Sequence, residues 1–391
     1  MKSTSRPRTL MLGAVSLTMA LGLSACSASN ESNGSDPSSS DSSDSSSSDS
    51  GTTTETSGGG SGSSGPVSGD LNGAGSSAQE AAMAAWKAGF QIANPDATVN
   101  YDPAGSSAGR EQFIAGGVLF AGSDAYLSDE ELASAEKTCG GPAIELPVYV
   151  SPIAVIYNLP DVSDLQLSPE TLAQIFAGKI TTWDDPAIAA DNPDASLPST
   201  AITPVHRSDG SGTTDNFTDY LDQVDPQDWT YGMVDEWPIK SGEGGDGTSG
   251  VVAAVTNGEG TIGYADESQA GDLGQALIKV GSDYVAPSAE AASKILDESK
   301  PVSGRAKATD LALAVNRTSK TAGVYPIILI SYQMVCSTYD SQDKVDLVKA
   351  FESYVVSSAG QEAAAQEAGS APITDALRTK ALAAIGKIAV K

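Results

Sequence analysis

One short run of the sequence concentrates the groups that can hold a small oxyanion. It reads Arg207-Ser208-Asp209-Gly210-Ser211-Gly212-Thr213-Thr214. An arginine side chain is a permanent cation that presents five N–H donors in a planar fork. Glycines let backbone N–H groups approach a ligand closely, and the N-terminus of a helix favours an anion. The run therefore predicts a site for a small tetrahedral oxyanion, in which Arg207 supplies the counter-charge.

Small hydroxyl residues stand at three turns between an expected strand and an expected helix. These turns are Ser76-Ser77, Ser106-Ser107 and Ser211-Gly212-Thr213. Each would place free backbone N–H groups and a hydroxyl at a helix N-terminus, where the helix dipole favours negative charge. One such turn is usually an ordinary helix cap. Three in one chain favour a shared anion site, because ligands of open α/β sheets bind at the carboxyl ends of the strands.

Asp124 follows an expected strand at residues 118–123 and would add a carboxylate to this site. An ionised carboxylate only accepts hydrogen bonds, so it can face an oxyanion only if that anion still carries a proton. Phosphate carries one near neutral pH and sulfate carries none, so Asp124 would make sulfate a costly like-charge contact. A solvated turn residue or a helix cap is the alternative for Asp124. Asp209 is expected to orient the guanidinium of Arg207.

The elements that would position these groups follow an α/β pattern of short apolar runs and amphipathic helices. We expect strands near 71–75, 99–101, 118–123, 202–206 and 261–264, and helices at 76–90, from 110, at 168–176, at 213–220 and at 344–356. Two extended apolar stretches, near 148–155 and 325–335, are expected to cross between two lobes as hinge strands. Lobe I would contain residues 70–150 and 325–391, and lobe II residues 151–324.

The N-terminus is typical of an exported lipoprotein. Residues 1–25 read as a signal peptide with a basic start and a short apolar stretch at 10–21, too short for a comfortable membrane span. The segment ends in Leu23-Ser24-Ala25-Cys26, which resembles a lipobox and predicts lipidation (palmitate) at Cys26. A plain signal peptide with a coincidental cysteine is the alternative. Residues 26–69 form a Ser/Gly/Asp-rich tether that we expect to be disordered.

Charge and cysteine content narrow the function further. The formal net charge of -28 argues against nucleic-acid binding, and it requires any anion site to be built locally from oriented donors. Cys139 and Cys336 form an even pair in an exported chain, so a disulfide is expected, with two buried thiols as the alternative. The single histidine, His206, and the lack of any His/Cys cluster with ligand spacing predict no metal and no cofactor.

Taken together, these motifs resemble those of a known family. They are Leu71-Asn72-Gly73-Ala74-Gly75-Ser76-Ser77, Gly105-Ser106-Ser107-Ala108-Gly109, Gly122-Ser123-Asp124-Ala125, Ile175-Phe176-Ala177-Gly178-Lys179-Ile180, Thr182-Trp183-Asp184-Asp185, the run from Arg207, and Tyr325-Pro326-Ile327. The chain resembles the phosphate-binding lipoproteins of bacterial phosphate ABC transporters (PstS-type), which belong to the periplasmic-binding-protein superfamily. The resemblance covers residues 71 to about 375.

The resemblance implies an α/β, two-lobed periplasmic-binding-protein fold (type II) with two hinge strands. It implies a monomeric, extracytoplasmic receptor, anchored at Cys26 to the outer face of the bacterial cell membrane. Such a receptor captures inorganic phosphate between its lobes and delivers it to the permease of an ABC transporter, without being an enzyme. The implied phosphate ligands are Ser77, the backbone N–H of Ala78, Ser106, Asp124, Arg207, Ser211, Gly212 and Thr213, with Ser107 and Asp209 in support. The family often has threonine at position 77 and an aromatic at position 78; the second difference leaves the backbone contact possible but can alter how water is excluded.

Other functions stay open at this point. Gly105-Ser106-Ser107-Ala108-Gly109 fits the G-x-S-x-G nucleophile elbow of a serine hydrolase, with Ser107 as nucleophile and His206 as the sole available base. The run from Arg207 lacks the Gly-Lys-Ser/Thr ending of a P-loop. A binder of another oxyanion, such as sulfate or molybdate, is a further alternative, which Asp124 opposes if it faces the ligand. An extracellular adhesin with the same fold is also compatible with the sequence.

Overall fold

A computed structural model describes residues 65–305 and 309–391 of the chain. The predicted signal peptide, the predicted lipidation at Cys26 and the predicted tether up to residue 64 lie outside the described residues. The first strand begins at Gly69, the last residue of the predicted tether. Within the described ranges, no helix combines the length and the apolar character needed to cross a bilayer.

The described residues are organised around one mixed sheet. Its strands are β1 (Gly69–Gly75), β2 (Ala97–Asp102), β3 (Phe120–Ser123), β4 (Ala143–Tyr157), β6 (Thr203–Arg207), β7 (Glu243–Gly245), β8 (Thr261–Asp266), β9 (Gly274–Gln275) and β14 (Ile328–Cys336). Their order is β2-β1-β3-β14-β4-β8-β6-β7, and β9 pairs with β4. β1 is parallel to β2 and β3, β14 is antiparallel to β3 and β4, and β8 is antiparallel to β4. Smaller sheets contain β5 (Gln166–Leu167), β10 (Leu277–Val280) and β11 (Asp283–Val285); β12 (Lys300–Pro301) and β13 (Leu313–Ala314); and β15 (Thr338–Tyr339) and β16 (Ala389–Val390).

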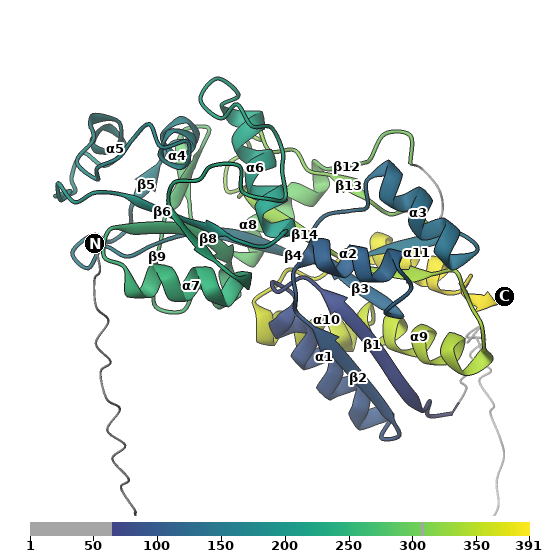
Figure 1. The fold of residues 1–391 in the computed structure, drawn as a ribbon. Coiled ribbons are helices and arrows are strands. Elements are labelled where there is room, and N and C mark those ends of the chain that lie inside the picture. Colours follow the sequence, from purple (N-terminus) through teal and green to yellow (C-terminus); the bar gives the residue numbers. More distant parts are fainter. Residues whose placement is uncertain (1–64, 306–308) are drawn as a thin grey trace, which may run out of the picture. The chain divides into compact units, whose positions relative to one another are not determined.

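Helices gather around the two ends of the main sheet (Figure 1). One group is α1 (Glu80–Ala93), α2 (Ser106–Ile114), α3 (Asp129–Cys139), α9 (Gln342–Val355), α10 (Ser358–Ala368) and α11 (Asp375–Ile385), which pack on β1 to β3, on the adjacent parts of β4 and β14, and on one another. We call this group and its strands lobe I. The other group is α4 (Pro169–Phe176), α5 (Pro186–Asp191), α6 (Gly212–Val224) and α7 (Gly247–Asn257), around β6 to β9, which we call lobe II. The short helix α8 (Ala289–Ser293) packs on β4.

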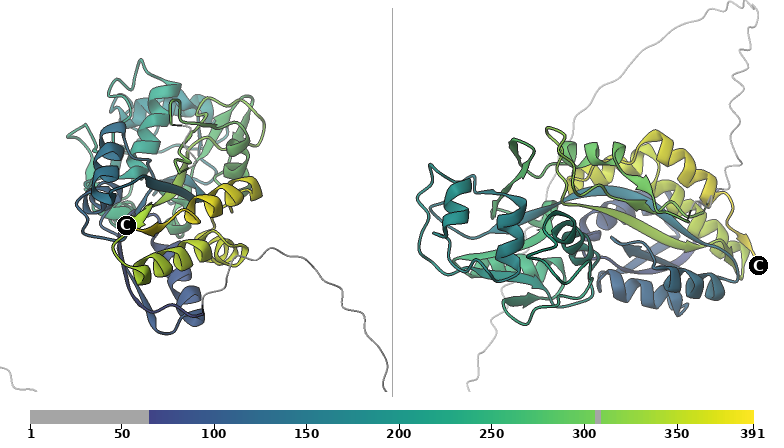
Figure 2. Two further views of the ribbon diagram at one scale, coloured as in Figure 1. Left: turned by 90° about the vertical axis from the view of Figure 1, so that its right-hand side faces the viewer. Right: turned by 90° about the horizontal axis from the view of Figure 1, so that it is seen from above.

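Strands β4 and β14 connect the two lobes (Figures 1 and 2). They pair antiparallel from Ile328 opposite Pro152 to Cys336 opposite Ala143, and all of β4 is buried. Beyond this stretch β4 pairs with β8, so one strand belongs to both lobes. These are the two hinge strands that the apolar stretches predict, whereas the lobe boundaries near residues 150 and 324 stay predictions. Pro147 is accommodated beside a β-bulge, because the pairing shifts between Ser331 and Tyr332.

Two helix starts differ from the predicted positions, for local reasons. α2 begins at Ser106 rather than near residue 110, because Gly105 adopts a positive φ of 98° and acts as its N-cap. α1 begins at Glu80 rather than at residue 76. The preceding turn is held by the Ser76 hydroxyl, whose Oγ accepts from the backbone N–H of Ala78 at 3.1 Å. Both helices therefore begin a few residues beyond a strand end, at a point that the preceding turn decides.

Cys139 and Cys336 are joined by a disulfide. The bond connects the last residue of α3 to the last residue of β14, across 197 residues of sequence. Both cysteines pack in a small apolar cluster with Phe113 and Leu132. The disulfide therefore ties the outer end of a hinge strand to the core of lobe I.

Candidate anion-binding site

The predicted site residues are buried at adjacent strand ends. Gly75 of β1 pairs with Gly122 of β3, so Ser76 and Asp124, which follow shortly after, emerge at one edge of the sheet. From lobe II, β6 ends at Arg207 and α6 begins at Gly212. The exposed fractions are 5% for Ser77, 0% for Ala78, 1% for Ser106, 2% for Asp124, 3% for Arg207, 1% for Ser211 and 1% for Thr213, so the set is shielded from water.

The Asp124 carboxylate stands at the centre of this cluster. Its Oδ2 accepts from the Ser76 hydroxyl at 2.6 Å and from the Thr213 hydroxyl at 3.4 Å. Its Oδ1 accepts from the Ser331 hydroxyl at 2.6 Å. These donors come from the end of β1, the start of α6 and the hinge strand β14. Both lobes and the hinge therefore meet at one buried carboxylate.

Opposing effects act on the protonation of Asp124. Burial raises the pKa of this carboxyl above its ordinary value, while the hydroxyl donors Ser331 and Ser76 and the positive charge of Arg207 act to lower it. An ionised carboxylate has about four acceptor positions. The hydroxyls of Ser76, Thr213 and Ser331 take three of them. The fourth position, on Oδ1, has no donor among the described residues, and an oxyanion could donate to it only if that oxyanion still carried a proton.

The first residue of α6, Gly212, packs directly against the first residue of α2, Ser106, with no room for a side chain between them. A Cβ at Gly212 would lie 2.7 Å from Ser106 Oγ and 2.9 Å from Asp124 Cβ, so no side chain fits there. Ser106 Oγ accepts from the backbone N–H of Asp124 at 3.2 Å, and Asn216 donates its amide to the Asp124 carbonyl at 2.7 Å. Ser211 caps α6 by accepting from the Thr214 N–H at 3.2 Å. Two helix N-termini from different lobes thus face each other across the buried carboxylate.

Arg207 is held in position by Asp209. Its Nε donates to Asp209 Oδ1 at 2.7 Å, and its second terminal nitrogen pairs with Asp209 Oδ2. Asp209 Oδ1 also accepts from the backbone N–H of Gly247, the first residue of α7, at 3.1 Å. Asp209 therefore holds one edge of the guanidinium in place, as the sequence predicts. Gly105 allows this approach, because a Cβ there would lie 2.5 Å from Asp209 Oδ2.

Ser77 contacts a residue that the sequence analysis did not select. Its hydroxyl lies 3.0 Å from the Thr248 hydroxyl and accepts from the Thr248 backbone N–H at 3.0 Å. The Ser77 carbonyl accepts from the Gln269 amide at 3.0 Å. Thr248 is the second residue of α7 and is 2% exposed. A further helix N-terminus of lobe II therefore reaches the turn that follows β1.

The Ser107 hydroxyl and the His206 ring have partners other than each other. Ser107 Oγ donates to Asp235 Oδ2 at 2.7 Å and accepts from Arg110 Nη2 at 3.3 Å. His206 Nδ1 lies 2.9 Å from the Arg207 carbonyl, and its ring stacks on Trp237 with the centroids 5.1 Å apart. This geometry does not give the nucleophile–base hydrogen bond that a serine hydrolase uses. Ser107 instead belongs to a contact between the lobes.

Sequence reasoning missed several residues that shape the site. Thr248 follows Gly245-Asp246-Gly247, a small-residue turn like the three selected ones, and that likeness could have identified it. Ser331 is a polar residue inside an otherwise largely apolar buried strand, which is a usable signal because buried polar groups need partners. Ser76 belongs to one of the predicted turns, but its contact with Asp124 depends on the register of β1 and β3.

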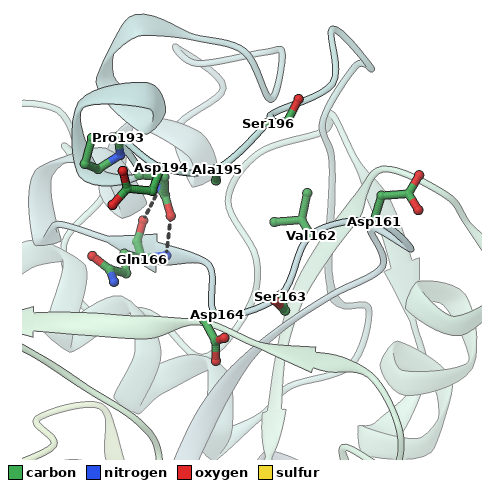
Figure 3. A pocket seen from close by; sticks show the side chains of 10 residues that line it. Asp161, Val162, Ser163, Asp164, Gln166, Pro193, Asp194, Ala195 and Ser196 are labelled. Carbon is green, nitrogen blue, oxygen red and sulfur yellow. Dashed lines mark hydrogen bonds between the residues drawn. The ribbon is translucent and has the colours of Figure 1, made fainter.

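A separate pocket lies in lobe II, between residues 161–166 and 192–196 (Figure 3). Asp161, Asp164 and Asp194 line it, and Asn192 bridges to the Gln166 backbone at 2.8 Å. It contains none of the predicted ligand residues. Its acidic side chains would repel an anion, so it is not a second site of the predicted kind.

Comparisons with known proteins point the same way as this geometry. Residues 60–359 match the family model described as PBP superfamily domain. The chain is 40% identical over 325 residues to the phosphate-binding protein PstS 3 of Mycobacterium tuberculosis (strain ATCC 25618 / H37Rv), covering 82% of this chain and 86% of that protein. It is 37% identical over 339 residues to the phosphate-binding protein PstS 3 of Mycobacterium leprae, covering 83% and 90%. A solved high-affinity periplasmic phosphate-binding protein (PfluDING), bound with phosphate, is similar in fold, with a TM-score of 0.68 at 22% identity over 80% of this chain and 93% of that one.

Proposed function

We propose that this chain, which belongs to the PBP superfamily and within it to the PstS phosphate-binding proteins, captures inorganic phosphate between its two lobes. The ligands are the hydroxyls of Ser77, Ser106, Ser211 and Thr213, the carboxylate of Asp124, the guanidinium of Arg207, and the backbone N–H groups of Ala78 and Gly212. Ser107 and Asp209 support them. The bound ion is held by hydrogen bonds and charge alone.

One observation carries the choice of phosphate. A buried carboxylate, Asp124, lies among anion-binding donors and keeps one acceptor position after Ser76, Thr213 and Ser331 have donated to it. A hydrogen phosphate ion can donate its proton to that position. A sulfate ion has no proton and would place negative charge against a desolvated carboxylate, which is a strongly unfavourable contact. The site therefore prefers an oxyanion that is a donor as well as an acceptor.

Positive charge and oriented dipoles supply the affinity. Arg207 is fixed by Asp209, and the N-termini of α2, α6 and α7 lie around the same cluster. Backbone N–H groups at helix starts and a guanidinium fork suit the oxygens of a tetrahedral anion. The net charge of -28 means that long-range attraction cannot account for binding, so the local donors must do so.

The cellular role follows from the N-terminal sequence and the family. Lipidation at Cys26 would anchor the protein at the outer face of the bacterial membrane, and the tether at 26–69 would let the folded part reach a partner there. The partner is the permease of a phosphate ABC transporter, which receives the ion when the lobes separate. We propose that the protein acts as a monomer and does not catalyse a reaction.

Calorimetric titration of the purified protein, stripped of bound ligand, tests the proposal. Phosphate and arsenate should bind, and sulfate should give no saturable heat at the same concentrations. Sulfate binding as tight as phosphate binding would contradict the proposal. Incubation with a chromogenic ester and with a phosphomonoester tests the non-enzymatic part: turnover that disappears in Ser107→Ala would show that a hydrolase reading is right.

A further inference from the structure

Ser331 is a fully buried polar residue in the middle of a hinge strand. It lies on β14 between Ile330 and Tyr332, and its exposed fraction is 0%. Its neighbours on the strand are apolar or aromatic, so its hydroxyl is costly to bury unless it is fully hydrogen-bonded. The side chain therefore needs a role that offsets this cost.

The contacts of Ser331 define a short chain of hydrogen bonds. Gln79 Nε2 donates to Ser331 Oγ at 2.7 Å and to the Tyr332 carbonyl at 2.8 Å. Ser331 in turn donates to Asp124 Oδ1 at 2.6 Å. Because an amide nitrogen only donates, the Ser331 oxygen must accept from Gln79, and its own proton is directed at Asp124. Gln79 is itself 0% exposed, so this orientation is fixed by packing.

Ser331 affects a different oxygen of Asp124 than the other hydroxyls do. Ser76 and Thr213 both donate to Oδ2, whereas Ser331 donates to Oδ1. Among the described residues, Oδ1 is also the oxygen that keeps a free acceptor position. Donation from Ser331 stabilises negative charge on that oxygen and fixes the plane of the carboxylate.

We propose that Ser331 is a specificity-determining positioning residue, which, held by Gln79, keeps the Asp124 carboxylate an acceptor and so excludes oxyanions that carry no proton. This inference rests on the proposed phosphate site and deepens it, by assigning selectivity to a hinge residue that acts through Asp124.

The consequence of losing Ser331 follows from the burial of Asp124. Burial already raises the pKa of Asp124, and among the groups that lower this pKa the Ser331 hydroxyl has the largest effect. Without it, a larger share of Asp124 is protonated near neutral pH. A protonated carboxyl can donate a hydrogen bond to a sulfate oxygen, so sulfate could bind, whereas the ionised carboxylate repels it. Selectivity against sulfate should therefore fall more than phosphate affinity does.

Titration of Ser331→Ala with phosphate and with sulfate tests this. The dissociation constant for sulfate divided by that for phosphate should fall by about tenfold, which is the loss expected for one hydrogen bond to a charged group. Ser331→Thr keeps the hydroxyl and should restore the ratio. Ser370→Ala is the matched control, because Ser370 is also buried, at 2% exposure, and its hydroxyl has no partner among the described residues. The ratio should be unchanged in this variant.

The pH dependence separates this role from a merely structural one. The ratio in Ser331→Ala should recover as the pH rises and Asp124 ionises again, so its profile is displaced to higher pH than that of the wild type. The other titratable or charged groups around Asp124 are Tyr101 on β2, Tyr149 on β4, Arg207 on β6 and Asp266 on β8. Of these four, Tyr149 also interacts with the Ser331 hydroxyl, but burial raises its pKa well above the neutral range, so it stays uncharged in the variant. Comparing variant and wild type at each pH cancels the titration of phosphate itself.

Each outcome has a distinct meaning. A selective wild type with an unchanged ratio and profile in Ser331→Ala would overturn the role of Ser331 and leave the proposed function intact. A wild type that binds neither anion, or that binds sulfate as tightly as phosphate, would overturn the proposed function and this inference with it. If Ser331→Ala does not fold, Gln79→Met removes the amide that orients Ser331 and should lower the ratio in the same direction; an unchanged ratio there would refute the proposal.

Discussion

The Asp235 carboxylate accepts a hydrogen bond from the Ser107 hydroxyl at 2.7 Å, which fastens a loop of lobe II to a helix of lobe I. Arg110, also on α2, adds an ion pair to the same carboxylate oxygen at 3.0 Å. Arg110 is kept in place from the other side by Glu131 at 2.9 Å. This contact lies outside the ligand set and joins the lobes where they meet.

Removing Asp235 should shorten the lifetime of the phosphate complex. Asp235→Ala breaks both contacts across the lobes, so the lobes should separate more readily, and dissociation of phosphate should become about five- to tenfold faster. Association should change little, because most affinity differences within one interface lie in the dissociation rate. Stopped-flow displacement of bound phosphate measures both rates. As a control, Asp222→Ala removes one negative charge from α6 and should leave the association and dissociation rates unchanged. If Asp235→Ala instead makes association faster without changing dissociation, Asp235 acts only by repelling the anion.

Arg207→Ala should weaken phosphate binding strongly. The buried ligand charge would lose its counter-charge, at a cost of about 3–5 kcal/mol. This corresponds to roughly 10²–10³-fold or more in affinity. Calorimetric titration measures the change, and a melting curve checks that Asp209, left without its partner, has not unfolded the lobe. Binding within about tenfold of wild type would place Arg207 outside the site.

Asp124→Asn should weaken discrimination against sulfate. The amide that replaces the carboxylate carries no charge and has a donor group, so an unprotonated oxyanion is no longer repelled. Competition of sulfate against labelled phosphate gives the ratio directly. Because the neutral side chain does not titrate, the ratio in this variant should also lose the part of its pH dependence that Asp124 causes. An unaltered ratio would show that the carboxylate does not face the anion.

Glu352 should make the protein less stable as the pH rises. This carboxyl on α9 is 0% exposed, and burial raises its pKa from 4.5 to about 8. The folded state then binds a proton that the unfolded state has released, so the stabilising effect is complete below pH 4.5 and is lost as the pH approaches 8. The loss is at most about 1.4 kcal/mol per pH unit. Urea denaturation between these limits should show this slope, and Glu352→Gln should flatten it, leaving the variant more stable than wild type at the alkaline end.

Reducing the Cys139–Cys336 disulfide should lower stability without altering the ligand site. The bond closes a loop of 197 residues, for which chain entropy gives a stabilisation of about 5 kcal/mol. The midpoint of urea unfolding should therefore fall on reduction or in the double serine variant. Phosphate affinity measured well below that midpoint should be retained, because both cysteines lie in a cluster of lobe I apart from the ligand residues. Loss of affinity in a folded reduced protein would mean that the end of β14 controls the site.

Local chemistry made much of the site predictable from sequence. Glycine and small hydroxyl residues at strand ends indicate helix starts with free N–H groups, and this located the turns at Ser77, Ser106 and Thr213. The apolar stretches predicted β4 and β14 because buried strands need continuous apolar residues. The prediction that Asp209 orients Arg207 is confirmed, because two side chains that are two residues apart in a turn can reach each other.

Contacts between distant segments could not be predicted in the same way. Ser331 lies 207 residues from Asp124 in the sequence, and Thr248 lies 171 residues from Ser77. Which segments meet depends on the order of the strands in the sheet, which has no local sequence signal. The predicted boundaries of α1 and α2 differ for a related reason, because side chains and glycine conformations in the preceding turns decide where each helix begins.

The close contact of Gly212 with the opposite lobe limits the size of the site. The lobes meet here through the backbone of α6 and the Ser106 hydroxyl, at a spacing that would not admit one methyl group. Phosphate and arsenate share charge, shape and protonation, so neither Asp124 nor Arg207 can tell them apart by chemistry. A preference between these two anions would instead come from the cost of moving the lobes apart to fit the larger arsenate. The backbone of α6 sets the distance between the lobes that arsenate would have to increase.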